Sequence, residues 1–224
     1  MTQELKKRSL PSRIAPPTAA ATAILDVAEQ LAQTRGYNGF SYADIASQLG
    51  VTKASLHYHF PSKAELGRAL IERYGILFEA ALEAIDQQAE EPREKLQRYV
   101  ALYNSVLSND RMCLCGMLAA EYATLPAPMQ EGLKLFFNAN ERWLTAVLED
   151  GLQSGAFRFR EPAGERARAL LGALEGVMLV ARSYGDPRRF QAAATCLLSD
   201  LTASSRSKPR RTLETAGALR SRRR

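Results

Sequence analysis

Histidine is nearly absent from this sequence: the chain of 224 residues has two, His57 and His59, on either side of Tyr58. The three cysteines are an odd number and do not suggest the disulfide framework of a secreted domain, so we expect reduced thiols in a cytoplasmic protein. No run of about twenty apolar residues occurs, which argues against a transmembrane helix and a membrane partner. The basic N-terminal stretch has no apolar segment after it, which argues against a signal peptide.

The scarcity of histidine also limits the chemistry that the chain can perform. Outside residues 57–59 no histidine is available to activate a Cys or Ser nucleophile, and the sequence has no Gly-rich phosphate loop. On a helix the side chains of His57 and His59 diverge by about 200°, so they cannot bind one metal ion together. An all-helical enzyme is therefore disfavoured, and we expect no metal and no cofactor.

Charge is distributed unevenly along a chain whose net charge is +6. Residues 75–204 carry 13 Lys and Arg against 17 Asp and Glu, whereas residues 205–224 carry eight against one. A basic end is typical of a protein that binds a polyanion, and equally of a solvated tail. We expect a flexible basic arm over 1–17, two folded domains over 18–74 and 75–204, and a disordered basic tail over 205–224.

Apolar residues recur at spacings of three and four along nearly the whole chain, which indicates an all-α fold. The first helix is predicted to run from Thr18 to Gly36. Two short helices follow, "ADIASQLG" and "KASLHYHF", with Ser41 and Thr52 as capping residues and Gly50 in the turn between them. This order of one longer and two short helices predicts a helix-turn-helix.

The second short helix has two distinct faces at about 100° per residue. Leu56 and Phe60 share the side predicted to be buried. The opposite side carries four residues, and His59 lies on its flank: Lys53, Ala54, His57 and Tyr58. No acidic residue occurs from 46 to 64. We therefore interpret the histidines as part of a DNA-facing surface.

Each residue type on this face suits the major groove. A small residue such as Ala54 lets the backbone approach the base edges, and Lys53 and Lys63 neutralise phosphates. Tyr58 and the histidines donate hydrogen bonds to phosphates or stack against sugars. Thr52 adds a hydroxyl group at the helix start.

The segment "GFSYADIASQLGVTKASLHYHFPSKAEL" resembles the DNA-binding domain of the TetR family of transcriptional regulators, over roughly residues 18–74. The resemblance implies that the DNA-contacting positions are Thr52, Lys53, Ala54, His57, Tyr58, His59 and Lys63. It also implies that Ser41 and Tyr42 touch phosphates. Ala54 and His57 depart from the family pattern, which commonly has glycine and tyrosine there, and both departures bear on the choice of operator.

Past residue 74 the pattern stays helical. Six helices are predicted, over 64–88, 91–108, 112–125, 126–155, 164–186 and 187–203. The resemblance implies a helical effector-binding and dimerisation domain over 75–204, in which the last two helices form a four-helix bundle across a homodimer. Gly172 and Gly176, four residues apart, either permit close approach of another helix or belong to a buried core helix.

The segment around Cys113 and Cys115 is the unusual part of this region. Cysteine and methionine most often fill core space. The alternative is a pocket wall with a thiol that reacts with an oxidant or electrophile, in which Arg111 favours the thiolate. For a small-molecule pocket we predict the lining residues Tyr103, Cys113, Met117, Trp143 and Met178.

These features predict a sequence-specific DNA-binding regulator, a repressor that a small-molecule effector, an electrophile or oxidant among the candidates, releases from a pseudo-palindromic operator on double-stranded DNA. Repression follows from the resemblance. The alternative is a constitutive architectural DNA-binding protein, which would respond to no effector.

Overall fold

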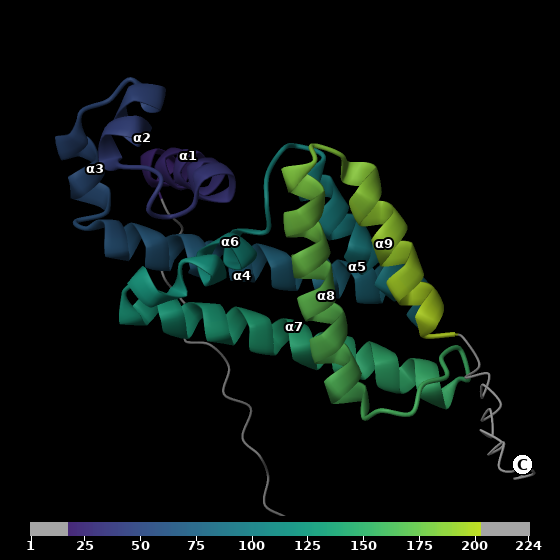
Figure 1. Ribbon diagram of the computed structural model, residues 1–224. Coiled ribbons are helices and arrows are strands. Elements are labelled where there is room, and N and C mark those ends of the chain that lie inside the picture. The colour runs from purple at the N-terminus through teal and green to yellow at the C-terminus, as the bar shows by residue number, and fades with distance from the viewer. Residues whose placement is uncertain (1–17, 203–224) are drawn as a thin grey trace, which may run out of the picture.

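The computed structural model describes residues 18–202, which form helices and no strand (Figure 1). In chain order the elements are α1 (Ala19–Arg35), α2 (Tyr42–Leu49), α3 (Lys53–His59), α4 (Lys63–Gln88), α5 (Pro92–Leu107), α6 (Leu114–Ala120), the 3-10 turn η1 (Tyr122–Thr124), α7 (Ala127–Gln153), α8 (Ala163–Ser183) and α9 (Pro187–Asp200). The predicted all-α fold is confirmed. The predicted arm over 1–17, the tail over 205–224, and residues 203 and 204 lie outside the described residues.

The first three helices form a small unit, which we call the head, at one end of the molecule (Figure 1). Their ends follow the predicted caps: Thr18 and Thr52 each accept a hydrogen bond from a backbone N–H in the first turn of the helix that follows. Gly50 ends α2 with a φ of 65°, a backbone conformation that glycine adopts without strain. Ile45 of α2 and Leu56 of α3 are fully buried, so both short helices are held by their apolar faces.

Helix α4 runs without a break from the head into the remaining helices, which we call the body (Figure 1). The predicted boundary between residues 74 and 75 therefore falls in the middle of one helix of 26 residues. The buried side chains of the head, of α4 and of the body belong to one continuous hydrophobic cluster. Close packing of this kind transmits displacement from one part to another.

In the body, α7 packs along α4, and α8 packs against α7 and α9. Among the described residues, no helix has the length and apolar character needed to cross a bilayer. The helix predicted over 112–125 is shorter than expected: α6 begins after its N-cap Cys113 and ends at Ala120, with Glu121 as its C-cap. The Glu121 carboxylate accepts hydrogen bonds from the backbone N–H groups of Tyr37 and Asn38 in the head.

The carboxyl end of α1 accepts hydrogen bonds from two segments of the body, helix α8 and the residues just before α6. Arg182 of α8 donates from Nη2 to the carbonyl oxygen of Thr34 at 2.6 Å and from Nη1 to that of Gln33 at 3.3 Å. The backbone N–H of Met112 donates to the Gln33 carbonyl at 3.2 Å. The last carbonyls of a helix have no partner within the helix and lie at its negative end, so a cationic donor there is favourable.

Loss of the Arg182 side chain should loosen this junction. We expect Arg182→Met to lower the free energy of unfolding by about 1–3 kcal/mol, because it removes charge-assisted bonds and leaves helix-end carbonyls unsatisfied. Urea unfolding measures the change. Arg168→Met is the matched control on the same helix: its side chain is 64% exposed and pairs with Glu141 at 3.5 Å, so it should cost under about 1 kcal/mol. Equal losses in the two variants would contradict a special role for Arg182.

Candidate nucleic-acid interface and effector pocket

The exposed face of α3 carries the predicted DNA-contacting side chains. Thr52, Lys53 and Ala54 are exposed, and Tyr58 is 84% exposed, the highest value for a large hydrophobic residue among the described residues. Leu56 points inward and is fully buried. The predicted division of this helix into a buried and an open side is confirmed, although Phe60 is only half-buried. The open side presents the Lys53 ammonium, the Thr52 hydroxyl, the small Ala54 side chain and the Tyr58 ring.

His57 is exposed and its ring is held in place from two sides. Its Nδ1 lies 3.2 Å from the carbonyl oxygen of Pro61, and its ring centroid lies 4.7 Å from that of Tyr42. His59 is half-buried, with its ring edge-on to Tyr58 at 5.1 Å between centroids. A fixed imidazole on this face offers one defined ring nitrogen, Nε2, for a base edge or phosphate.

The structure does not place Tyr42 as the predicted phosphate contact. Tyr42 is buried, and its hydroxyl donates to the carbonyl oxygen of Phe60 at 2.7 Å. Burial raises the pKa of this phenol to about 12, so the hydroxyl stays protonated. Tyr42 therefore joins the start of α2 to the end of α3. Ser41 is exposed, and its Oγ lies 2.6 Å from Asp44, so at this helix start it is a capping residue.

Lys63 also differs from the expectation that it neutralises a phosphate. Its Nζ donates to the carbonyl oxygens of Tyr37 and Phe40, both at 2.5 Å. The same ammonium lies 4.5 Å from the centroid of each of the two aromatic rings of these residues. Burial lowers the Lys63 pKa. The sequence shows the positive charge of Lys63 but not that the loop carbonyls after α1 bind it.

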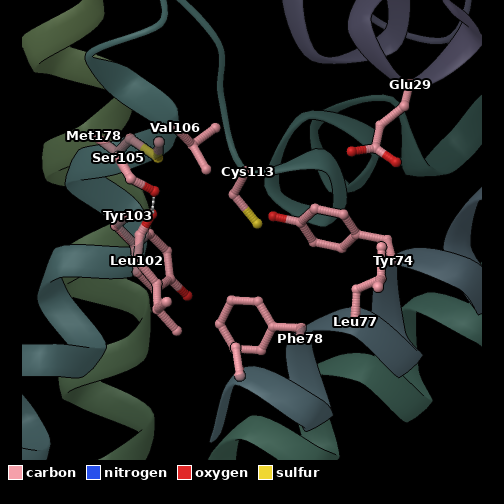
Figure 2. Close-up of a pocket in the computed structure, with 11 residues that line it drawn as sticks. Glu29, Tyr74, Leu77, Phe78, Leu102, Tyr103, Ser105, Val106, Cys113 and Met178 are labelled. Carbon is pink, nitrogen blue, oxygen red and sulfur yellow. Dashed lines mark hydrogen bonds between the residues drawn. The ribbon is translucent and has the colours of Figure 1, made fainter. Parts of the chain in front are cut away.

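A cavity of about 180 Å³ lies between α1, α4, α5 and α8 (Figure 2). Tyr74 and Phe78 of α4 form one side, and Tyr103 of α5 and Met178 of α8 form the other. The Tyr74 hydroxyl points toward the Cys113 sulfur (Figure 2). The lining is mainly apolar, with a few polar groups, as is usual for small-molecule sites.

Three of the predicted pocket residues line this cavity, namely Tyr103, Cys113 and Met178. Trp143 and Met117 do not. The Trp143 ring stacks on Tyr99 at 5.4 Å and its Nε1 donates to Asp86 at 2.9 Å, while the Met117 sulfur lies 3.6 Å from Arg182. Met117 was selected because it lies close in sequence to Cys113, but Cys113 is the N-cap of α6 and Met117 lies within that helix.

The cavity also has lining residues that sequence reasoning did not select, chiefly Glu29, Tyr74 and Phe78. Glu29 belongs to α1 of the head, and its Oε2 accepts a bond of 2.6 Å from Arg73 of α4. The signal for Tyr74 and Phe78 was a pair of aromatic residues four apart on one face of the predicted helix over 64–88. Nothing in the sequence indicated that Glu29 lines the same cavity as Tyr103, which lies 74 positions later.

The surroundings of Cys113 do not favour a reactive thiolate. Cys113 and Cys115 are buried. Burial, followed by the nearby Glu175 carboxyl, raises the pKa of both thiols well above the ordinary value. Arg111, which was expected to favour the thiolate, instead lies with its Nη1 3.4 Å from Gln33. A raised pKa keeps the thiol protonated and a poor nucleophile.

Glu175 of α8 completes this buried polar group. Its pKa is raised by burial, and the facing Cys113 thiol and Tyr103 hydroxyl lower it in part. The described residues contain no group of three or more His, Cys, Asp or Glu placed to hold a metal ion. The sequence signal for Glu175 was its position as the single charged residue between 169 and 180.

The fold and the surface of α3 together define a helix-turn-helix DNA-binding protein with a separate helical body. Residues 24–70 match the family model described as bacterial regulatory proteins of the tetR family. A TetR-family regulator of known structure from Agrobacterium tumefaciens is 34% identical, with 84% of this chain and all of that chain covered and a TM-score of 0.80. A second, from Legionella pneumophila, is 34% identical, with 80% of this chain and 95% of that chain covered and a TM-score of 0.73.

This chain belongs to the TetR family and is a DNA-binding transcriptional regulator. Among curated relatives, the nucleoid occlusion factor SlmA of Vibrio campbellii is 32% identical over 82 residues, which span 37% of this chain and only 40% of that protein. The HTH-type transcriptional regulator YxaF of Bacillus subtilis is 23% identical over 168 residues, with 73% of this chain and 85% of that protein covered.

The first prediction from this geometry concerns Lys63. We expect Lys63→Met to lower the free energy of unfolding by about 1–3 kcal/mol, because two loop carbonyls lose their donor. Lys53→Met, in which an exposed lysine of α3 is replaced, should change it by less than about 0.5 kcal/mol. Urea unfolding of both variants tests the assignment. A stable Lys63 variant with reduced DNA affinity would restore its predicted phosphate role.

The second prediction concerns the thiols. In a Cys196→Ser background, which removes the exposed cysteine, we expect a thiol reagent such as Ellman's reagent to label neither remaining cysteine in the folded protein. After unfolding in urea, both should react. Rapid labelling of the folded protein that disappears in a Cys113→Ser variant would revive the thiol sensor.

The third prediction follows from the raised pKa of Glu175. In the folded state this carboxyl holds its proton more tightly than in the unfolded chain, so its contribution favours folding at low pH. The contribution is lost as pH rises from the ordinary value of 4.5 through the folded pKa. We therefore expect the stability of Glu175→Gln relative to the natural protein to increase between pH 4.5 and pH 8, measured by thermal unfolding. A difference independent of pH would contradict the shift.

Proposed function

We propose that the protein binds a two-fold symmetric operator as a homodimer and represses transcription until a small-molecule effector enters the body and releases it. The proposed DNA binding is supported by the exposed side of α3, which presents Lys53, Ala54 and Tyr58 to solvent. No acidic residue occurs from 46 to 64. A small residue admits the helix backbone to the base edges, and a lysine neutralises a phosphate. Regulators of this family act by binding DNA rather than by catalysis.

The homodimer is supported by the outer side of α8. Leu179 and Val180 are each 56% exposed, an unusual state for adjacent aliphatic residues. Within the described residues, nothing lies within 4 Å of where a Cβ would be at Gly172 or Gly176, so this side can accept another helix closely. A two-fold dimer sets two recognition helices to two half-sites about 34 Å apart, one turn of DNA.

Release by an effector is supported by the position of Glu29. This residue lines the cavity and also holds Arg73, so it connects the pocket to α1 of the head. A ligand in the cavity contacts the helix on which α2 and α3 are built. For release, the ligand must bind the conformation that does not fit DNA more tightly than the one that does, because equal affinity for both shifts nothing.

Selection of bound fragments from genomic DNA by the purified full-length protein, at physiological salt, tests this proposal. We expect enrichment of a pseudo-palindrome with half-sites one helical turn apart. The same bound site is then challenged with a panel of small molecules. Enrichment without release by any of them would favour a constitutive architectural protein, and no enriched site would contradict the regulator.

Variants of α3 separate general affinity from sequence preference. We expect Tyr58→Ala and Lys53→Ala to weaken binding to every sequence, and Lys53→Ala to reduce the slope of affinity against salt by about one. His57→Ala should change the preferred bases at one position of each half-site, at a cost of about 1–3 kcal/mol for the best site. Equal losses on operator and random DNA for His57→Ala would remove it from the base-reading residues.

A further inference from the structure

The Glu175 carboxyl is buried and, in the part of the chain that the structure describes, forms no hydrogen bond of good geometry, although the Cys113 thiol and the Tyr103 hydroxyl face it. Neither of its oxygens has a hydrogen-bond donor in bonding geometry among the described residues. The packing makes room for it: a Cβ on Gly116 of α6 would overlap Glu175 Oε2. The other buried polar group of the body, Asn140, shows the contrast, since it accepts from the Tyr99 hydroxyl at 3.0 Å and donates to the Phe136 carbonyl at 3.0 Å. An unsatisfied buried carboxyl in a native fold needs an explanation.

No protein cation compensates Glu175. It takes part in none of the ion pairs formed by the described residues, which hold nine such contacts. The arginines at the junction with the head are used there, Arg182 by carbonyls of α1 and Arg111 by Gln33. Burying an ionised carboxylate is costly unless a cation joins it.

Two of the residues that line the cavity also face the Glu175 carboxyl. Cys113 and Tyr103, which face it, both line the cavity, and so does Met178, one helical turn further along α8. Tyr74, on the opposite side in Figure 2, is also within electrostatic range of Glu175. The Cys113 and Tyr103 side chains therefore adjoin both the cavity and the carboxyl.

The size and lining of the cavity restrict what can enter. Its volume of about 180 Å³ is close to the roughly 150 Å³ of an engineered apolar cavity that binds benzene. The aromatic rings of Tyr74, Phe78 and Tyr103 present faces and edges that suit a second ring or an alkyl chain, and they also attract a cation.

We propose that the effector is a small organic amine, of one ring or a short alkyl chain, whose ammonium group pairs with Glu175 while its apolar part fills the cavity. The regulatory consequence of this binding depends on the function proposed above. With no cation beside it, a buried carboxyl favours its protonated form. When the ammonium ion binds, the carboxyl ionises and one proton passes to solvent, so the charges balance within the site.

Isothermal titration calorimetry of the full-length protein with benzylamine tests the pairing, with benzyl alcohol as an uncharged probe of the same shape. We expect benzylamine to bind at least about tenfold more tightly than benzyl alcohol. Glu175→Gln should weaken benzylamine by about 10- to 100-fold and leave benzyl alcohol unchanged. Glu79→Gln, which replaces an exposed glutamate of α4, should alter neither.

Proton release distinguishes a direct partner from a group that only shapes the pocket. Titrations in buffers of different ionisation enthalpy should give a release approaching one proton per benzylamine bound to the natural protein, and none for Glu175→Gln. Equal affinity for amine and alcohol, loss of both probes in Glu175→Gln, or no binding of benzylamine and butylamine at millimolar concentration would each overturn the proposal.

Operator binding, followed in parallel, separates this inference from the proposed function. Amine binding that depends on Glu175 without release of the operator keeps the ligand class and refutes effector-controlled repression. Release of the operator by uncharged molecules alone keeps effector control and refutes the amine.

Discussion

The position of the head relative to the body depends on the hydrogen bonds at the carboxyl end of α1. The carbonyls at the end of a helix need outside donors, and here Arg182 and the Met112 N–H supply them from the body. Since α2 packs on α1, and α3 on α2, the orientation of the recognition helix is set by groups that lie outside the head. The residues of the proposed DNA-binding surface on α3 follow from the local sequence, whereas the position of this surface depends on hydrogen bonds from Arg182 and Met112 in the body.

The cavity adjoins the same junction, which gives the body a physical means of acting on the head. Glu29 lines the cavity and holds Arg73, while α4 carries Tyr74 and Phe78 on the cavity wall and begins in the head. Close-packed helices do not deform continuously; they move between discrete packings. A ligand between α4, α5 and α8 would therefore contact a helix that begins in the head.

Much of the fold could be predicted because its signals are local. The caps at Thr18 and Thr52, the glycine at position 50, and the two faces of α3 follow from side-chain chemistry within a few residues. The errors at Lys63 and Trp143 involve long-range contacts. Lys63 was assigned to phosphate from its charge, but its bonds run to loop carbonyls 23 and 26 positions earlier. Trp143 was assigned to the pocket as an aromatic wall, but its indole N–H donates to Asp86 on another helix.

The sequence by itself determined the helices, their ends, the apolar faces and the acid-free exposed side of α3, since each depends on periodicity and short-range hydrogen bonding. Only the tertiary structure decided which polar groups meet. The tertiary structure buries Tyr42, Cys113 and Cys115, and bonds Lys63 to loop carbonyls of the head. Within residues 18–202 it also leaves the Glu175 carboxyl without a hydrogen bond of good geometry near a small cavity. Burial and pairing decide the charge and the availability of a side chain, and both are properties of packed neighbours far apart in the chain.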